Sequence, residues 1–170
     1  MLVPATVFAE EVSRKFRMIA YTERMFWFSG NQDYFVPNLS DEQEPGEYRY
    51  VCVSQDCKQI YGYLAFHINF ETRTLDKISC IRFTDDGRIT FNRDVLNKVN
   101  EAIDSMNLHR VEFWMIGGNP VLPAYQKFVK SKGGREVVLK DVSVDKYGKY
   151  HDSHIFEIIL KEGQSNVSID

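Results

Sequence analysis

The segment GGNPVLPAYQKFVKSKGGRE, residues 117–136, contains the side chain with the clearest capacity for chemistry, Tyr125. Its phenol has an ordinary pKa near 10, so it is protonated at neutral pH and can donate a proton to a leaving group. The same tyrosine also fits the apolar face of a helix, and the members of that face are Leu122, Tyr125, Phe128 and Val129. The segment therefore predicts a well-delimited helix, and it leaves Tyr125 open between a core residue and a proton donor.

Other residue types that do chemistry form weaker patterns. The three cysteines, Cys52, Cys57 and Cys80, have no CxxC spacing, which favours free thiols in a reducing compartment over a nucleophile or a ligand set. The sequence HDSH, residues 151–154, places two histidines three positions apart, a pattern of low specificity for metal that is expected here in a hairpin turn. We predict no metal site.

Composition limits the class of protein. The chain has 170 residues, of which 44% are hydrophobic, and this predicts one globular domain over residues 1–170. A formal net charge of -3 argues against a nucleic-acid partner, which would require a basic surface. The start, MLVPATVFAEEV, lacks the basic region of a signal peptide, and two glutamates interrupt its apolar run. We therefore expect a cytoplasmic protein without a membrane partner.

The elements that must position Tyr125 follow from periodicity and turn residues. Helices are expected at residues 5–28, at 92–106 with Asn92 as N-cap, and in the segment between Asn119 and Gly133. A long polar loop is expected at 29–47. Strands are expected at residues 48–54, 59–70, 74–83, 110–116, 135–145 and 154–160.

The order of these elements predicts the topology. The first three strands follow one another through short links, as in an antiparallel meander. The helix at 92–106 joins the strands at 74–83 and 110–116 as a crossover, which requires those two strands to be parallel. The fold class is therefore α+β (mixed α/β), a mostly antiparallel sheet with one parallel pair, flanked by helices. The turn from strand to helix in such a crossover is a common site for a phosphate.

The second half of the chain resembles the GNAT superfamily of N-acetyltransferases. The resemblance rests on NLHRVEFWMIGGNPVLPAYQKFVKSKGGRE followed by KDVSVDKYGKYHDSHIFEIIL, that is, a strand, an Asn, a helix with a Tyr six residues after that Asn, and a final hairpin. The element order from residue 48 to 160 matches as well. An initial strand, usual in the family, is barely visible in MLVPAT. The resemblance implies an acyl-CoA N-acyltransferase fold and acetyl-CoA as cosubstrate.

The chain departs from the family in the loop that cradles the pyrophosphate of acetyl-CoA. Aligning Leu96 with the helical Leu of the family places Arg88 at the Gln/Arg position of the motif, and Phe91 and Arg93 at its two glycine-type positions. Asp85 and Asp86 add negative charge nearby. One interpretation is that Arg88 and Arg93 bind phosphate through their side chains. The other is a solvated turn in a protein that has lost its activity.

The resemblance also assigns roles. Tyr125 is implied as the general acid for the departing thiolate, and Asn119 as a contact to the pantetheine arm. Backbone N–H groups at Ile81, Arg82 and Phe83 are implied to polarise the thioester carbonyl. A general base does not stand out, since the following candidates are all more typical of surface or edge positions: His67, Glu71, Asp76 and Glu112. Three lysines, Lys127, Lys130 and Lys132, either meet the 3′-phosphate of CoA or form a solvated helix face.

We therefore expect an N-acetyltransferase that acts on an amine of a small molecule or a peptide. The alternative is a GNAT-like binding or regulatory module without catalysis. A homodimer built through the last hairpin or the 29–47 loop is compatible with both. Four aromatic residues could line an acceptor cleft or simply lie in surface turns: Tyr34, Phe35, Tyr147 and Tyr150.

Overall fold

The computed structural model describes residues 1–29, 37, 39 and 45–160. These residues form a seven-stranded sheet with the order β1-β2-β3-β4-β5-β7-β6. The strands are β1 Leu2–Pro4, β2 Glu47–Val53, β3 Ile60–Asn69, β4 Thr74–Arg82, β5 Arg110–Ile116, β6 Arg135–Val144 and β7 Tyr150–Ile159. The helices are η1 Ala5–Phe8, α1 Ala9–Ile19, α2 Glu23–Ser29, α3 Arg88–Ser105 and α4 Leu122–Ser131. Only β4 and β5 pair in parallel within these residues, so the predicted mixed fold class is confirmed.

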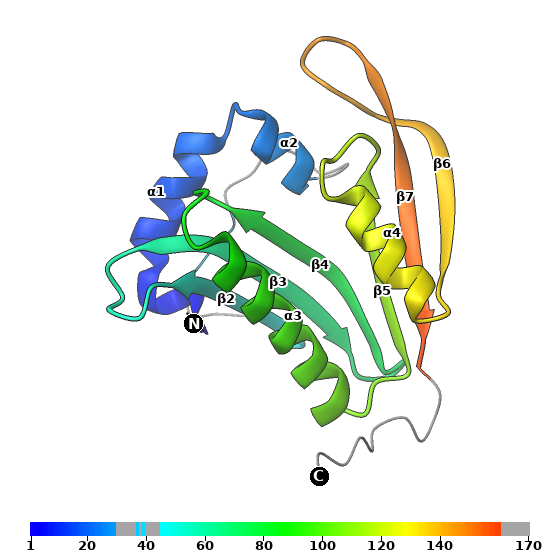
Figure 1. Cartoon of the computed structure of the whole chain (residues 1–170), viewed down its shortest axis with the longest axis horizontal. Helices are drawn as coiled ribbons and strands as arrows, with labels where there is room; N and C mark the ends of the chain where they lie inside the picture. The colour runs from blue at the N-terminus through cyan, green and yellow to red at the C-terminus, as the bar shows by residue number, and fades with distance from the viewer. Residues whose placement is uncertain (30–36, 38, 40–44, 161–170) are drawn as a thin grey trace.

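Helices cover both faces of the sheet. Figure 1 shows α3 and α4 crossing the front of the sheet, with α1 behind its left-hand part. Leu64 and Phe66 of β3 pack on the α3 and α4 side, while Tyr63 packs with Val12 and Phe16 of α1 on the other side. A strand that is buried on both faces must be apolar at successive positions, which explains the nearly continuous apolar run of β3.

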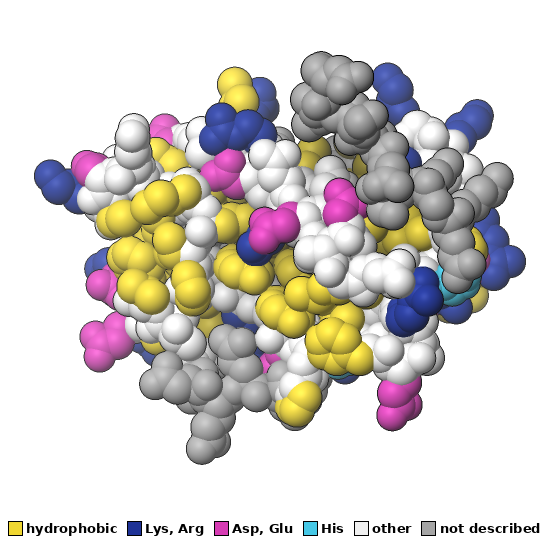
Figure 2. All heavy atoms as spheres, turned by 90° about the horizontal axis from the view of Figure 1, so that it is seen from below, with side chains coloured by type: hydrophobic (Ala, Val, Ile, Leu, Met, Phe, Trp, Pro, Cys, Tyr) yellow, Lys and Arg dark blue, Asp and Glu magenta, His cyan; other side chains and the backbone are white. Residues whose placement is uncertain are grey.

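Neither the surface charge nor the helices indicate a nucleic-acid or membrane-spanning region in the described residues. Figure 2 shows hydrophobic side chains interspersed with acidic ones on one face, with Lys and Arg mainly around its rim. In the part of that face which the structure describes, the basic side chains do not form a continuous stripe. Among the described residues, none of the helices combines the length and apolar character needed to cross a membrane.

The N-terminal segment differs from the single helix expected at residues 5–28. The barely visible initial strand exists as β1, which pairs antiparallel with β2. The helix is interrupted between Ile19 and Glu23, where the Thr22 hydroxyl donates to the Ile19 carbonyl at 2.7 Å. The apolar spacing from Ile19 to Phe26 continues across this break, and for that reason periodicity alone did not reveal it.

The start of α3 also differs from the prediction. Asn92 is not the N-cap, because α3 begins at Arg88 after Gly87, whose φ of 66° lies in the left-handed region. A Cβ on Gly87 would lie 2.6 Å from the Tyr61 ring, so a glycine is required here by both conformation and space. The first turn of α3 is therefore the segment that the sequence predicted as a loop.

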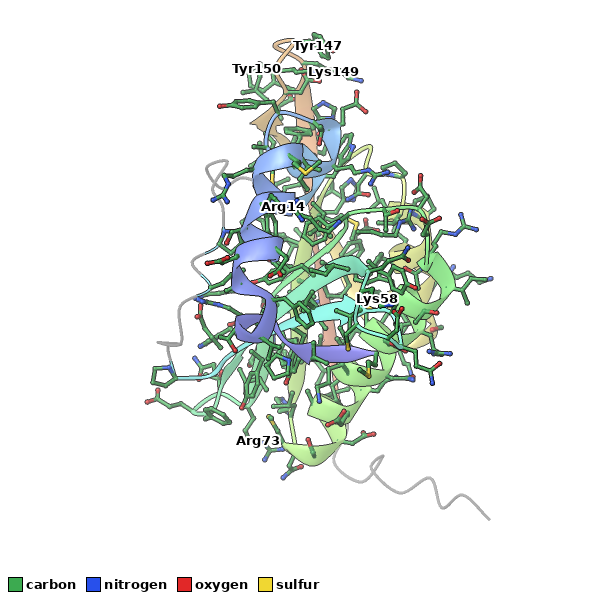
Figure 3. All side chains as sticks on the ribbon, turned by 90° about the vertical axis from the view of Figure 1, so that its left-hand side faces the viewer. Arg14, Lys58, Arg73, Tyr147, Lys149 and Tyr150 are labelled. Carbon is green, nitrogen blue, oxygen red and sulfur yellow. The ribbon has the colours of Figure 1, made fainter. Side chains whose placement is uncertain are left out.

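The last hairpin is longer than predicted. Strand β7 begins at Tyr150, so the HDSH sequence lies within a strand and not in a turn. The register between β6 and β7 shifts between Leu139 and Ser143, as in a β-bulge. Figure 3 shows Tyr147 and Tyr150 together at the tip of this hairpin, at the opposite end of the molecule from Arg73. Both tyrosines are exposed.

Candidate active site

The candidate site is the opening between β4 and β5. The two strands pair only at their N-terminal ends, where Thr74 lies opposite Arg110 and Leu75 opposite Val111. Figure 1 shows them separating toward their C-terminal ends. The separation begins beside a register shift between β3 and β4, where Lys77 has a φ of 50°. Because a bulge bends the strand that contains it, this irregularity accounts for the divergence of β4 from β5.

The backbone of β4 presents N–H groups to this opening. The Phe83 N–H donates to the Tyr61 carbonyl of β3 at 2.8 Å. Successive N–H groups of a strand point to opposite edges, so the Ile81 N–H also faces β3, while those of Cys80 and Arg82 face the opening. The side chains of Ile81 and Phe83 pack with the α1 cluster on the other face. Of the three residues expected here, only Arg82 therefore directs its N–H toward the gap.

Tyr125 reaches the opening from α4. Its side chain is partly buried, and its ring packs edge-on against Phe113 of β5 with a centroid distance of 5.5 Å. Burial raises the pKa of the Tyr125 phenol, and the neighbouring Cys80 thiol of β4 raises it further. Burial also raises the pKa of Cys80 to about 12. Both groups are therefore protonated at neutral pH. The Tyr125 N–H donates to the Val121 carbonyl at 3.3 Å, but its phenol makes no hydrogen bond with any described residue.

Both ends of α4 are fixed by its flanking residues. The Asn119 side chain accepts a hydrogen bond from the Val121 N–H at 3.1 Å, and α4 begins at Leu122. Asn119 thus precedes the helix and is not its N-cap, and Pro123 falls in the first turn, where its missing N–H costs no intrahelical bond. At the other end, Gly133 has a φ of 69°, and the Gly134 N–H donates to the Val129 carbonyl at 2.9 Å. This is a Schellman motif.

The N-terminus of α3 borders the same opening. Its first internal hydrogen bond runs from the Phe91 N–H to the Gly87 carbonyl at 2.8 Å. The three preceding N–H groups, from Arg88 to Thr90, have no acceptor within the helix, and the helix dipole gives this end a positive partial charge. Arg88 is exposed and forms no ion pair within the described part of the chain. The helix end and Arg88 together suit an anion.

The other residues expected near this loop face elsewhere. The Phe91 ring is buried over β3, and a Cβ on Gly62 would lie 2.4 Å from it. The Arg93 guanidinium pairs with Asp94 at 2.9 Å, and Asp94 in turn pairs with the amino group of Met1. Both side chains therefore point away from the α3 N-terminus.

Comparison with known proteins identifies the architecture. No protein-family model and no curated protein matches the sequence. Among solved structures, ribosomal-protein-alanine N-acetyltransferase from Brucella melitensis matches with a TM-score of 0.67 and 16% identity, over 94% of this chain and 99% of that chain. The chain has the GNAT fold. At this identity the likeness establishes the fold and not the reaction.

Two further structures with this fold match more weakly. Spermidine/spermine N-acetyltransferase SpeG from Vibrio cholerae, in complex with manganese ions, matches with a TM-score of 0.54 and 18% identity, over 86% of this chain and 87% of that chain. Another acetyltransferase matches with a TM-score of 0.51 and 19% identity, over 68% of this chain. The chain covers 58% of that protein, less than two thirds of its length.

Within this GNAT fold, α2 bridges the open ends of the two diverging strands. Arg24 donates to the Phe83 carbonyl at the end of β4 at 2.9 Å and approaches Asp85 at 3.5 Å. Trp27 lies against Gly118 after β5 and packs edge-on against His151. Sequence reasoning missed these residues, because the contact between Arg24 and Phe83 joins positions 59 apart and no local pattern marks it.

His151 fixes the end of β5 to the last hairpin. Its Nδ1 lies 3.0 Å from the Gly117 carbonyl, and its Nε2 lies 3.0 Å from an Asp145 oxygen. Both neighbours are hydrogen-bond acceptors, so the ring links the end of β5 to the loop before β7. The hydrogen bond from His151 lowers the pKa of Asp145. This pair positions the end of β5.

The remaining candidates lie away from Tyr125. His67 pairs with Asp76 at 2.7 Å, and Glu112 pairs with Arg110, all toward the closed end of β4 and β5. His154 binds Glu136 at 2.6 Å, so the two histidines of HDSH have separate partners. Among the described residues, no group of three potential ligands could hold a metal. Tyr34 and Phe35 lie outside the described residues, and Lys127, Lys130 and Lys132 are exposed.

Proposed function

We propose that this protein is an N-acetyltransferase that transfers an acetyl group from acetyl-CoA to an amine of a small molecule or a peptide. The observation that carries the proposal is the opening between β4 and β5, which has the Tyr125 phenol on its α4 side and the Arg82 N–H on its β4 side. Acyl transfer needs a donor for the charge that develops on the carbonyl oxygen and a proton for the departing thiolate. The two groups match these needs.

The α3 N-terminus supplies the features that a pyrophosphate requires. Three N–H groups without intrahelical acceptors, the helix dipole and the exposed Arg88 all favour an anion. Asp85, whose charge would oppose an anion, pairs with Arg82 at 2.9 Å and with Arg24 at 3.5 Å. When bound, acetyl-CoA supplies the activated acetyl group. The Asn119 side-chain amide, whose oxygen is already bonded, keeps its N–H groups for the pantetheine arm.

The acceptor class rests on similarity alone. The structural neighbours include an enzyme named for an alanine of a ribosomal protein and one named for spermidine and spermine. Both acceptors carry a free amine, which supports an amine as the nucleophile here. A covalent acyl-cysteine route is not favoured, because burial holds the pKa of Cys80 near 12 and leaves almost no thiolate at neutral pH.

Binding of CoA is the first test. At a ligand concentration 100 times its dissociation constant, a native-state ligand stabilises by about 2.7 kcal/mol, which corresponds to a rise of roughly 5–10 °C in the melting temperature of a chain of this size. We expect such a shift with acetyl-CoA and with CoA, measured by differential scanning fluorimetry. Dephospho-CoA and free adenine serve as controls. An unchanged melting temperature at millimolar acetyl-CoA would contradict the proposal.

A binding or regulatory module is the second candidate. This candidate is favoured by the ion pair between Arg93 and Asp94. In the phosphate-binding interpretation, the Arg93 guanidinium would have to bind a phosphate of CoA instead. Binding of CoA without release of thiol in the presence of an amine panel, which should include spermidine and peptides with a free N-terminus, would support the module. Thiol release above the rate of uncatalysed hydrolysis would support the enzyme.

Arg24 is expected to position the end of β4 for catalysis. Its guanidinium is partly exposed, so Arg24→Ala is expected to cost at most about 1 kcal/mol of stability. Small misplacements in an active site cost much more in rate, so kcat/KM is expected to fall roughly 10- to 100-fold. Arg14→Ala is the control, because Arg14 is an exposed residue of α1, which packs on the face of the sheet opposite α3 and α4 (Figure 3). Equal kcat/KM values for the two variants would exclude a positioning role.

A further inference from the structure

A second hollow lies between α4 and the last hairpin. Its volume is about 310 Å³, at the lower end of the range for small-molecule sites. Four side chains of α4, the Glu136 side chain of β6, the Phe156 side chain of β7 and the backbone of Gly134 line it. Figure 1 shows α4 in front of β5 and β7, with β6 beside it. Because the sheet order places β5 and β7 between β4 and β6, this α4–β6 cavity is separate from the opening between β4 and β5.

The inner surface of the α4–β6 cavity is apolar. Val129 and Phe156 lie beneath it, and both are buried. Gly134 passes so close to Val129 that a Cβ would lie 2.7 Å from the Val129 Cγ1 atom, so a side chain at this position cannot occupy the space. Lys127 and Lys130 add their methylene stems to the wall. The cavity therefore suits a ligand that has an apolar part.

Glu136 supplies a fixed negative charge on the β6 side of the cavity. Its Oε1 accepts a hydrogen bond from Gln126 Nε2 of α4 at 2.8 Å and lies 2.6 Å from His154 Nδ1 of β7. Although desolvation by burial opposes it, the hydrogen bonds from Gln126 and His154 lower the pKa of Glu136, so the carboxylate is ionised at neutral pH. Its Oε2 makes no hydrogen bond with any described residue. This second oxygen is therefore free to accept from the ammonium group of a ligand.

Lys127 and Lys130 supply positive charge on the α4 side of the cavity. They are three positions apart in one helix and are therefore neighbours on its surface. Both are exposed, and neither forms an ion pair within the described part of the chain. Gln126, which contacts Glu136, precedes Lys130 by four residues, or roughly 6 Å along the helix axis. The negative and positive charges of the cavity thus lie about one helical turn apart.

We propose that the α4–β6 cavity binds a small zwitterion, an α-amino acid with an apolar side chain. Its ammonium group meets the free oxygen of Glu136, its carboxylate meets Lys127 and Lys130, and its side chain lies over Val129. A ligand with only a negative charge would also meet Glu136, and one with only a positive charge would also meet the two lysines. The zwitterion is the class of ligand that matches both sides.

Calorimetric titration of the full-length chain with L-phenylalanine, in the absence of CoA, tests the ligand class. Saturable binding is expected at millimolar concentrations. Two analogues separate the charges: 3-phenylpropionate has only the carboxylate, and phenethylamine has only the ammonium group. Each is expected to bind roughly 10-fold more weakly than L-phenylalanine, because each loses one charged hydrogen bond. The absence of saturable binding, or analogues that bind as tightly as the amino acid, would overturn the proposal.

Variants of the cavity locate the site. Glu136→Gln and Lys130→Ala are each expected to weaken binding of L-phenylalanine roughly 10-fold, with native affinity retained for 3-phenylpropionate and phenethylamine, respectively. Lys132→Ala is the matched control, since Lys132 is exposed at the same end of α4 but does not line the cavity. Native affinity for L-phenylalanine in Glu136→Gln and Lys130→Ala would overturn the proposal.

A titration in the presence of saturating CoA separates this cavity from the opening between β4 and β5. The affinity for L-phenylalanine is expected to stay within about twofold of its value without CoA, because the two sites do not overlap. Displacement of L-phenylalanine by CoA would place the amino acid in the opening and overturn the proposal. A chain that binds L-phenylalanine with the expected dependence on Glu136 and Lys130, but does not bind CoA, would contradict the proposed acetyltransferase and support this inference.

Discussion

Replacing Tyr125 with Phe is expected to lower kcat for acetyl transfer by about 10²- to 10⁴-fold, the usual contribution of a general acid. The ring, its contact with Phe113 and the burial of the helix face are all retained, so only the proton is lost. KM for acetyl-CoA and the melting temperature are expected to stay near the native values, because the interaction is made in the transition state. Steady-state thiol release with a saturating amine measures the change.

The raised pKa of Tyr125 adds an expectation about how activity depends on pH. Burial and the Cys80 thiol both disfavour the phenolate, so the proton remains available well above neutral pH. If the protein is the proposed acetyltransferase, ionisation of Tyr125 is therefore not expected to lower its activity in the range where an ordinary phenol begins to ionise. Tyr48→Phe is a matched control, since this half-buried tyrosine stacks on Phe66 of β3 away from the opening. If Tyr125→Phe and Tyr48→Phe both retain native kcat, Tyr125 is a core residue only.

Much of the fold could be predicted from local patterns. Strand β5 was expected at exactly the residues where it lies, and β2, β3 and β4 within a residue of their bounds, because alternating and β-branched runs end at clear turn residues. The crossover through α3 then required the parallel pair. Periodicity could not show where a helix is interrupted without a change of face, as between Ile19 and Glu23.

The candidate site was less predictable than the fold. Tyr125 and Asn119 could be singled out because they lie in one short segment with clear helix boundaries. The bridge from Arg24 to Phe83, and the pair formed by His151 and Asp145, depend on contacts between distant segments, and residue types alone do not predict those. The N–H groups of Ile81 and Phe83 could not be distinguished from that of Arg82 until the register with β3 was known.

The start of α3 shows how a local rule can mislead. Asn92 satisfies the N-cap preference, but Gly87 provides the left-handed turn that begins the helix five residues earlier. Phe91 consequently falls in the first turns of a helix and points into the core. The alignment that places Phe91 at a glycine-type position of a phosphate loop concerns only position along the chain. It does not describe where the side chain goes.

Replacing Phe91 with Gly therefore distinguishes a core role from a cofactor-loop role. If the backbone at this position had to approach a pyrophosphate closely, glycine would improve binding of CoA. The structure instead has the Phe91 ring 3% exposed and packed over Gly62. Removing a buried Phe side chain costs about 3–5 kcal/mol, and glycine inside a helix adds about 1 kcal/mol. We expect a loss of about 4–6 kcal/mol in the free energy of unfolding, measured by urea denaturation.

Ile89→Gly isolates the backbone part of this cost. Ile89 lies two residues earlier in the same helix and is 80% exposed, so its replacement removes little buried surface and is expected to cost about 1 kcal/mol or less. Phe91→Leu keeps most of the buried surface. It provides a folded variant if the loss of free energy in Phe91→Gly is large enough to unfold the protein. Since Phe91 anchors the first turn of α3 to β3, we expect Phe91→Leu to bind CoA more weakly than Ile89→Gly does. If the Phe91→Gly protein has native stability and binds CoA more tightly, position 91 belongs to a phosphate-binding loop and the core role is wrong.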